Sequence, residues 1–501
     1  MTVLFLANVG NHDVRLTDRS LLPTELADQR LSARQLGETI LAHYAHYAPA
    51  LDLPLIGVSL RWLLEREQVA PGELYVHLFA SDQPPETPAR EWSKDTVPFA
   101  QVIQRFLKEG GLEWTAEVEQ DGQRRKTRQR LRLSRRQMHV HSIVGNPADY
   151  GTMLDFFGQK LPWLAAKIGP GDRVYVEVSG GTPAMTSMLI IAGVNVFGQR
   201  ADTLYVERGA DEPYRISVGR RLLAGHACDT LRTQLDLCAY AAASATFDAE
   251  KDLLPINRES RLLIEALLKY ADCRLAFDFH RAREALNEAR LYARGETRSR
   301  VENWWRELGQ RDSALFLTEL VHGADIKYQL GEYADFTQRL FRFQEASFRH
   351  LAEEMGMRYR DPDSDEHLDL AWADKVAGLR PFLDQYPTPD GYPLRLDTSL
   401  NRISLGAIVD FFTQHDPHWT GLRSVVESTH RLSAVAKLRN KGLAGHGFVG
   451  IGKEDLDQQF GGDADQIIPL LRQIYEAIFG QPVKPNPYVA INGLLSELLA
   501  A

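Results

Sequence analysis

The sequence contains few of the residues that mark redox, membrane or secreted proteins. Only three of its 501 residues are cysteines, and the spacing of Cys228, Cys238 and Cys273 fits neither a metal site nor a redox pair. So little cysteine is typical of a reducing cytoplasm. The apolar run Met188–Phe197 is too short to cross a bilayer, and Val3–Ala7 is too short for a signal peptide. We therefore expect a cytoplasmic protein that does not enter a membrane.

The chain also lacks an excess of positive charge. Its formal net charge is −9, which argues against a general polyanion-binding surface, so any contact with RNA must come from a local basic cluster. Neither Asn8–Asp13 nor Ser179–Thr182 fits the Gly-x-Gly-x-x-Gly spacing of a dinucleotide fingerprint, and there is no Walker loop, which argues against nicotinamide, flavin and nucleoside triphosphate chemistry. We find no helix-turn-helix and no metal-binding motif such as His-Glu-x-x-His. The sequence thus predicts no DNA partner, no metal site and no cofactor.

Short apolar runs alternate with helical patterns through the N-terminal part of the chain. Such alternation predicts an α/β domain with a Rossmann-like, doubly wound parallel sheet. The expected strands are Thr2–Ala7, Leu74–Phe79, Val140–Val144, Val174–Val178 and Thr203–Val206.

Four of these strands end in small polar or glycine-containing turns. Parallel strands bind ligands at their carboxyl ends, and glycines and free N–H groups there suit phosphate oxygens. Capping alone explains any single turn, but four turns at one edge favour a ligand site. The candidate residues are Asn8, Gly10, Asn11, His12, Asp13, Ser81, Asn146, Ser179, Gly180, Gly181 and Thr182.

From Leu222 onward, the pattern changes to long helical segments, which predicts an all-α C-terminal half. Near its end, apolar residues from Val425 to Val435 recur at helical spacing, and Arg439 falls on the same face. A guanidinium on a core-facing position needs a partner or a function. Gly442 and the glycines after it predict that the helix ends before His446 or close to it.

An arginine and a histidine brought together are suited to cleaving a phosphodiester. Lys437 and Lys441 add positive charge around Arg439, as an RNA-binding cluster would require. An arginine and a histidine at this separation also occur by chance in many helices, so this pattern alone leaves a structural role open.

A dense basic run from Arg124 to Arg136 follows the turn at Asp121-Gly122, with an acidic arm from Glu113 before it. This pattern predicts a β-hairpin. The basic arm could contact RNA, but charge pairing between the two arms explains the composition without a ligand.

Three segments together resemble one family. The opening strand running into Asn-Val-Gly-Asn-x-Asp, and the Ser179-Gly180-Gly181-Thr182 loop, resemble the ligand loops of CARF domains. The Arg439-Asn440 pair followed by His446 resembles the signature of HEPN ribonucleases. Their combination resembles the type III CRISPR-associated ancillary ribonucleases. One departure is Pro183, where many CARF domains carry a lysine that contacts phosphate.

The resemblance implies a CARF sensor domain at 1–222, a helical connector at 223–328 and a HEPN domain at 329–501. It also implies a homodimer, activated by cyclic tetra- or hexa-adenylate, that cleaves single-stranded RNA without a metal in antiviral defence. Attack by the ribose 2′-OH would leave a 2′,3′-cyclic phosphate and a 5′-OH. The catalytic residues would be Arg439, Asn440 and His446.

Two other functions remain open from the sequence. The helical half could bind a partner without catalysis, making the protein a cyclic-nucleotide sensor only. Alternatively, the HEPN chemistry could operate without a nucleotide activator, as in toxin-type ribonucleases. The ring size of an activator and the fate of that ligand in the CARF domain cannot be read from the sequence.

Overall fold

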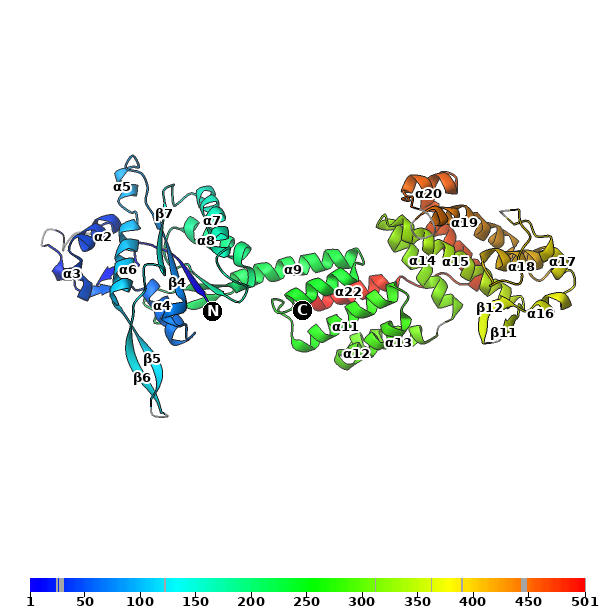
Figure 1. The fold of residues 1–501 in the computed structure, drawn as a ribbon, viewed down its shortest axis with the longest axis horizontal. Helices are drawn as coiled ribbons and strands as arrows, with labels where there is room; N and C mark the ends of the chain where they lie inside the picture. The colour runs from blue at the N-terminus through cyan, green and yellow to red at the C-terminus, as the bar shows by residue number, and fades with distance from the viewer. Residues whose placement is uncertain are drawn as a thin grey trace. The chain divides into compact units, whose positions relative to one another are not determined.

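The structure is a computed structural model, which describes residues 1–23, 26, 31–120, 123–310, 312–361, 363–388, 391–442 and 448–500. The chain divides into two compact units, Met1–His226 and Ala227–Ala501. Figure 1 shows the elements of each unit along the chain.

A six-stranded sheet forms the centre of the first unit. Its order is β10-β9-β8-β1-β4-β7, and all neighbours are parallel except β9 and β10. The predicted α/β fold is confirmed, with the difference that the edge strand β10 makes the sheet mixed. The strands are β1 (Val3–Asn8), β4 (Leu74–Ser81), β7 (Met138–Ile143), β8 (Arg173–Glu177), β9 (Ala201–Tyr205) and β10 (Tyr214–Ile216).

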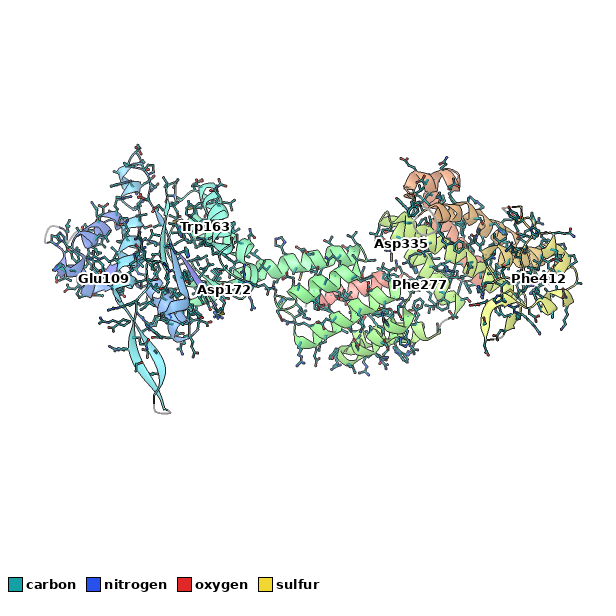
Figure 2. All side chains as sticks on the ribbon, viewed as in Figure 1. Glu109, Trp163, Asp172, Phe277, Asp335 and Phe412 are labelled. Atoms are coloured by element: carbon teal, nitrogen blue, oxygen red, sulfur yellow. The ribbon has the colours of Figure 1, made fainter. Side chains whose placement is uncertain are left out.

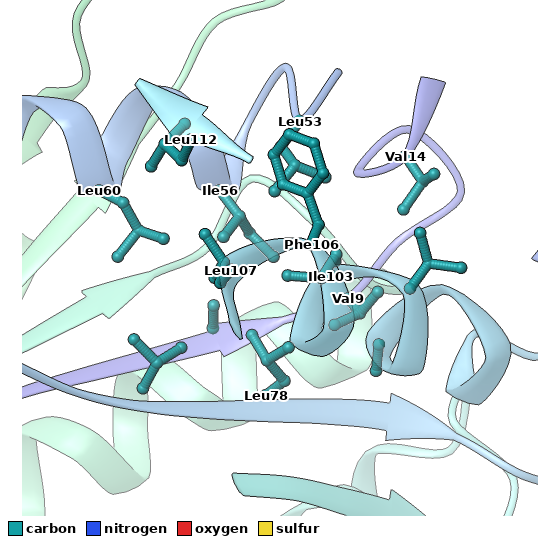
Figure 3. Close-up of a cluster of buried hydrophobic side chains, with 14 of the residues drawn as sticks. Val9, Val14, Leu53, Ile56, Leu60, Leu78, Ile103, Phe106, Leu107 and Leu112 are labelled. Carbon is teal, nitrogen blue, oxygen red and sulfur yellow. The ribbon is translucent and has the colours of Figure 1, made fainter. Parts of the chain in front are cut away.

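Helices cover both faces of this sheet. All six residues of β1 are buried, and its five apolar residues alternate between two cores. Val3 and Phe5 belong to the core beneath α2 (Ala33–Ala42), α4 (Ile56–Glu65) and α6 (Val97–Glu109), part of which Figure 3 shows. Leu4 and Leu6 belong to the core beneath α7 (Tyr150–Ala165) and α8 (Pro183–Phe197). Burial on both faces explains why β1 reads as a continuous apolar run.

The smaller elements of this unit lie between those strands and helices. They are β2 (Arg15–Leu16), η1 (Arg19–Leu21), α3 (Tyr44–Tyr47), η2 (Ala48–Ala50), β3 (Leu51–Asp52), η3 (Pro71–Glu73), α5 (Ala89–Trp92) and η4 (Gly198–Arg200).

The predicted hairpin is present as β5 (Leu112–Gln120) and β6 (Gln123–Leu131). Its register sets acidic residues opposite basic ones: Glu113 faces Arg130, Glu117 faces Lys126 and Glu119 faces Arg124. Arg130 and Glu113 form an ion pair at 3.1 Å. The pairing of the two arms agrees with the interpretation that charge pairing within the hairpin explains its composition without a ligand.

The second unit is mostly helical, as predicted, apart from a two-stranded ladder. The ladder joins β11 (Tyr359–Asp361) and β12 (Ser364–Leu368). The helices are α9 (Val218–Asp236), which begins in the first unit, α10 (Tyr240–Glu250), α11 (Arg258–Leu275), α12 (Phe279–Tyr292), α13 (Gly295–Gln310), α14 (Ser313–Gln329), α15 (Tyr333–Glu354), α16 (Leu370–Lys375), α17 (Leu379–Asp384), α18 (Arg402–His415), η5 (Thr420–Leu422), α19 (Arg423–Lys441), α20 (Lys453–Phe460), η6 (Ala464–Gln466), α21 (Ile467–Phe479) and α22 (Pro487–Ala500).

The helix α15 connects two apolar cores in this unit. Its Phe343 packs with Leu432 and Val435 of α19 in one core. Its Phe348 packs in the other core with Phe412 of α18, which Figure 2 labels. The long helix therefore fixes α18 and α19 relative to each other, and these helices carry the residues discussed below.

The C-terminal helix α22 packs back on the first helices of the unit, beside α11. The Tyr240 hydroxyl donates to Asn492 Oδ1 at 2.8 Å, and Asn492 Nδ2 donates to the Leu235 carbonyl at 2.6 Å. Residues 487–500 thus pack with the predicted connector, although the division at 329 assigns them to the HEPN part. The three-domain division of the chain stays a prediction.

Candidate functional site

The loops that follow β1, β4, β7 and β8 meet at the carboxyl edge of the sheet and enclose a cavity of about 310 Å³. Six residues predicted from the sequence line it, and they come from all four loops. They are Gly10, Asn11, Ser81, Asn146, Gly181 and Thr182. The parallel strand order therefore brings together segments that are far apart in the sequence.

Two glycines let the first and fourth loops pack backbone against backbone. A Cβ on Gly10 would lie 2.5 Å from the amide nitrogen of Gly181, and one on Gly180 would lie 2.6 Å from the carbonyl oxygen of Asn8. Gly181 itself has φ +89°, a conformation that side chains rarely adopt. These glycines thus serve loop packing, which is a different reason from the ligand approach that the sequence suggested.

Thr182 ties the fourth loop to its surroundings. It is the N-cap of α8, where its hydroxyl accepts from the Met185 amide at 3.2 Å, and the same hydroxyl donates to the Pro147 carbonyl of the third loop. Nearby, Ser179 Oγ accepts from the Val206 amide at 2.6 Å. Both hydroxyls already have partners, so their first role here is to fix the walls of the cavity.

Asn8, Asp13 and Glu177 lie buried beneath the loops. Asp13 Oδ2 accepts from the Gly10 amide at 2.7 Å, and Glu177 Oε1 accepts from the Ser179 amide at 2.9 Å. Burial raises the pKa of both carboxyls far above the usual range, and the charge of Asp13 adds to the shift at Glu177. Two buried carboxyls so close cannot both ionise cheaply, so the pair retains a proton near neutral pH.

Sequence reasoning missed several residues that line the cavity: Gln83, Glu91, Lys94, Asp95, Thr96 and Met185. Of the described residues around it, Lys94 carries the positive charge, and it is exposed. Lys94 directly precedes the buried Asp95, which Arg34 holds through an ion pair at 3.0 Å. The Lys-Asp-Thr sequence before α6 is the feature that could have indicated this part of the cavity. Among the predicted residues, His12 is exposed and is not part of the lining.

Arg439 lies near the end of α19, on the face that packs against α15. Its guanidinium carbon is 4.2 Å from the ring centre of the half-buried Phe341, which is within range for a cation–π contact. The Arg439 Nε is buried and makes no hydrogen bond with any residue that the structure describes. The prediction that Arg439 faces the apolar side of its helix is confirmed.

A second arginine approaches the same ring. Arg402, at the start of α18, lies with its guanidinium carbon 5.7 Å from the centre of Phe341. It donates to Gln344 Oε1 at 3.1 Å and to Ser433 Oγ at 2.5 Å. Burial lowers the pKa of Arg402 and Glu345 raises it, while the charge of Arg439 also lowers it. The sequence did not single out Arg402, because only the fold brings it to α19.

The helix α19 ends at Lys441, before His446, as the glycines predicted. Gly442 and Val449 form an isolated parallel bridge, so the chain returns beside the helix end soon after leaving it. His446 lies outside the described residues, and so do the side chains of Lys437, Asn440 and Lys441. Their predicted roles stay predictions.

A cavity of about 830 Å³ lies between α15 and the segment around Phe277, which Figure 2 labels together with Asp335. It is lined by three phenylalanines (Phe277, Phe279 and Phe316) and by both kinds of charge. Its arginines are Arg339, Arg342 and Arg349, and its carboxylates are Asp278, Asp335 and Glu345. Because these charges balance, the cavity offers no excess charge to a phosphate. None of the residues predicted for the sites lies in it.

In the part of the chain that the structure describes, no cluster of histidine, cysteine and acidic side chains could hold a metal ion. In the same residues, no helix combines the length and the apolar character needed to span a membrane.

The fold of this chain resembles that of a solved structure. The solved structure of Enterococcus italicus Csm6 bound to cyclic hexa-2′-fluoro-hexa-dAMP is similar, with a TM-score of 0.59 and 14% sequence identity. The match covers 99% of this chain and 100% of that one. At this identity the likeness shows a shared fold, and at that level the resemblance is confirmed. No protein-family model and no curated protein matches the sequence.

Proposed function

We propose that this protein is a cyclic oligoadenylate-activated endoribonuclease that cleaves single-stranded RNA in type III CRISPR antiviral defence in the cytoplasm. One observation carries the proposal. A single chain joins a four-loop cavity at the edge of a parallel sheet to a helical half in which the buried Nε of Arg439 makes no hydrogen bond with any described residue. Its fold matches Csm6 from end to end.

The proposed reaction is attack of the ribose 2′-OH on the adjacent phosphorus. It yields a 2′,3′-cyclic phosphate and a 5′-OH, and it needs positioning, charge stabilisation and proton transfer. Arg439 would hold the phosphate, His446 would move the proton, and Asn440 would orient one or the other. Lys437 and Lys441 would contact the RNA backbone. The nucleophile belongs to the substrate, so this route requires no metal.

The activator would bind in the cavity formed by Gly10, Asn11, Gly181, Thr182 and their neighbours. The exposed Lys94 suits a phosphate there, since it offers a cation where Pro183 replaces the lysine of many CARF domains. Because the ligand of the similar Csm6 structure is a ring of six nucleotides, cyclic hexa-adenylate is the first ligand to test.

A homodimer with two facing motifs is part of the proposal. Phe448 and Val449, which follow shortly after His446 in the sequence, expose 93% and 62% of their surface. Apolar side chains this exposed gain stability when a second subunit covers them. The native mass of the purified protein tests this point.

The test incubates the full-length protein with a fluorogenic single-stranded RNA in EDTA, with and without cyclic tetra- or hexa-adenylate. We expect cleavage that requires one of these ligands and that His446→Ala abolishes, while the same variant still binds the activator. Cleavage without any activator would favour a toxin-type ribonuclease. Activator binding without cleavage under any condition would leave a sensor whose helical half is not a ribonuclease.

A further inference from the structure

Arg402 and Arg439 form a pair of like charges that no carboxylate neutralises directly. Both guanidiniums lie over Phe341, with their carbons 5.7 Å and 4.2 Å from the ring centre. The polar partners of Arg402 are neutral: Gln344 Oε1 and Ser433 Oγ. Among the described residues, neither arginine forms a salt bridge.

The nearest acidic group is already engaged. Glu345 influences the pKa of Arg402, but its carboxylate pairs with Arg342 at 3.2 Å, and its side chain is only 16% exposed. Two cations that converge in a half-buried site repel each other, and the repulsion costs stability unless an anion binds between them. A protein that keeps such a pair next to its proposed active site has a use for it.

The surroundings hold Arg402 firmly in place. The buried Gln344 donates to the Thr429 carbonyl at 2.7 Å and to Ser433 Oγ at 2.8 Å, so it bridges α15 and α19 while it accepts from Arg402. Arg402 is the first residue of α18. A guanidinium fixed in this way presents its remaining N–H groups with little loss of entropy on binding, and these groups match the oxygens of a phosphate.

We propose that Arg402 and Arg439 together form a phosphodiester-binding site for the RNA substrate, with Arg402 as a second cation at the scissile phosphate or the one beside it. This inference rests on the proposed ribonuclease function and assigns a role to a residue outside the Arg-Asn…His motif. The Phe341 ring lies within cation–π range of both guanidiniums and stabilises the two charges while the site is empty.

The test compares Arg402→Gln and Arg402→Lys with wild type. The matched control is Arg423→Gln, at the opposite end of α19, where Arg423 pairs with Glu427 on the surface. Binding is measured by fluorescence anisotropy over a range of NaCl concentrations, with cyclic hexa-adenylate present. The probe is a labelled single-stranded RNA that is fully 2′-O-methylated, so it cannot be cleaved by 2′-OH attack. Cleavage of unmodified RNA gives kcat and KM.

We expect Arg402→Gln to lower kcat/KM about ten- to a hundredfold, mainly through KM, as loss of a charged hydrogen bond predicts. The slope of log K against log [NaCl] should become shallower by about 0.7, the loss of one phosphate contact on a single strand. Arg402→Lys should keep the salt slope, because the positive charge remains. It should lose part of kcat/KM, because an ammonium group lacks the paired N–H donors of a guanidinium. The melting temperature of Arg402→Gln should fall by no more than a few degrees, since removal of the repulsion offsets the loss of the hydrogen bonds to Gln344 and Ser433.

The inference is overturned if wild type cleaves RNA while Arg402→Gln keeps its rate and salt slope. It is also overturned by a combination of two results. Arg402→Gln melts several degrees below wild type, and Arg402→Lys is folded and cleaves and binds RNA like wild type. If wild type binds the methylated RNA but never cleaves, the ribonuclease proposal fails, and the salt slope alone then decides the phosphate site. If wild type neither binds nor cleaves, both proposals fall.

Discussion

At the scale of single residues, the most unusual feature is a pair of buried carboxyls below the loops that line the cavity. Asp13 and Glu177 have no cation as a partner among the described residues, and burial raises the pKa of both. Each instead accepts a backbone N–H from a loop above it, Gly10 for Asp13 and Ser179 for Glu177. The loops that shape the cavity are therefore held by groups whose charge changes near neutral pH.

This arrangement predicts an unusual dependence of stability on pH. The folded protein keeps a proton that the unfolded chain releases at about pH 4, so stability falls as the pH rises from there towards neutral. The slope reaches about 1.4 kcal/mol per pH unit for each retained proton. Asp13→Asn still accepts from the Gly10 amide but never ionises, so its free energy of unfolding should change less over this range. Urea unfolding at several pH values measures the difference.

Identical pH profiles for wild type and Asp13→Asn would contradict the shared proton. Asp172 provides the control, because it accepts from the amides of Thr2 and Gly169 at the surface, where these bonds lower its pKa. Asp172→Asn should leave the profile above about pH 5 unchanged, because that carboxylate is almost fully ionised there in both the folded and the unfolded state.

Lys94 offers a second prediction at this scale. If its ammonium contacts a phosphate of the activator, Lys94→Met should weaken the binding of cyclic hexa-adenylate by roughly three- to tenfold, as loss of an exposed charge contact implies. Isothermal titration calorimetry on full-length protein measures this. Lys167→Met, beyond the carboxyl end of α7, is the matched control and should bind like wild type. Equal affinities for all three proteins would remove Lys94 from the site.

The sequence predicts the surroundings of a single residue only where one element carries the whole signal. It predicted the apolar face of Arg439 because the neighbours on that face belong to the same helix. It did not single out Arg402 or Lys94, because each reaches its present neighbours only through the packing of another element. Asn8 and Asp13 were predicted as ligand contacts, and the structure places both under the loops, fully buried. A pattern of polar residues at a strand end does not reveal which of them face inward.

At the scale of elements, the packing of the first and fourth loops explains the glycines of both. A methyl group on Gly180 would collide with the backbone of Asn8, which cannot move without displacing β1. Gly180→Ala should therefore destabilise the first unit by about 1–3 kcal/mol, as overpacking does elsewhere. It should also weaken activator binding, since both loops line the cavity. Chemical denaturation and calorimetry together measure the two effects.

Gly158 is the matched control. It is exposed within α7, and a Cβ there would meet nothing within 4 Å. Gly158→Ala should stabilise the protein by about 0.5–1 kcal/mol, because alanine loses less backbone entropy in a helix. If both variants shift stability in the same direction, the close approach at Gly180 does not constrain the loop.

The sequence predicted the helices and strands themselves better than it predicted which other elements they pack against. The strands of the first unit were recognisable because burial on both faces makes them continuous apolar runs bounded by turns. The antiparallel β10 was missed, because it is short and its residues are mostly exposed. The position of α22 beside α11 was also not foreseeable, since its apolar pattern shows that it is buried but not against which helix.

At the scale of the whole molecule, the proposed function requires that two separate units respond to each other's ligands. The cavity proposed for the activator lies within Met1–His226, and Arg439 lies within Ala227–Ala501. An activator can change the second unit only if it binds better to the arrangement that favours RNA. The proposed function therefore requires a coupling free energy between the binding of the activator and the binding of RNA. Binding experiments can measure this free energy without any cleavage.

Such coupling must be reciprocal. If cyclic hexa-adenylate increases the affinity of the protein for a fully 2′-O-methylated RNA by some factor, that RNA must increase the affinity for cyclic hexa-adenylate by the same factor. A coupling of 1–3 kcal/mol corresponds to about 5- to 150-fold. Two anisotropy titrations, each with the other ligand saturating, give both factors. The Gly180→Ala protein should bind RNA like wild type without the activator but lose the enhancement. RNA affinity that is unchanged by the activator would mean that activation acts on the chemical step, since linkage constrains binding and not kcat.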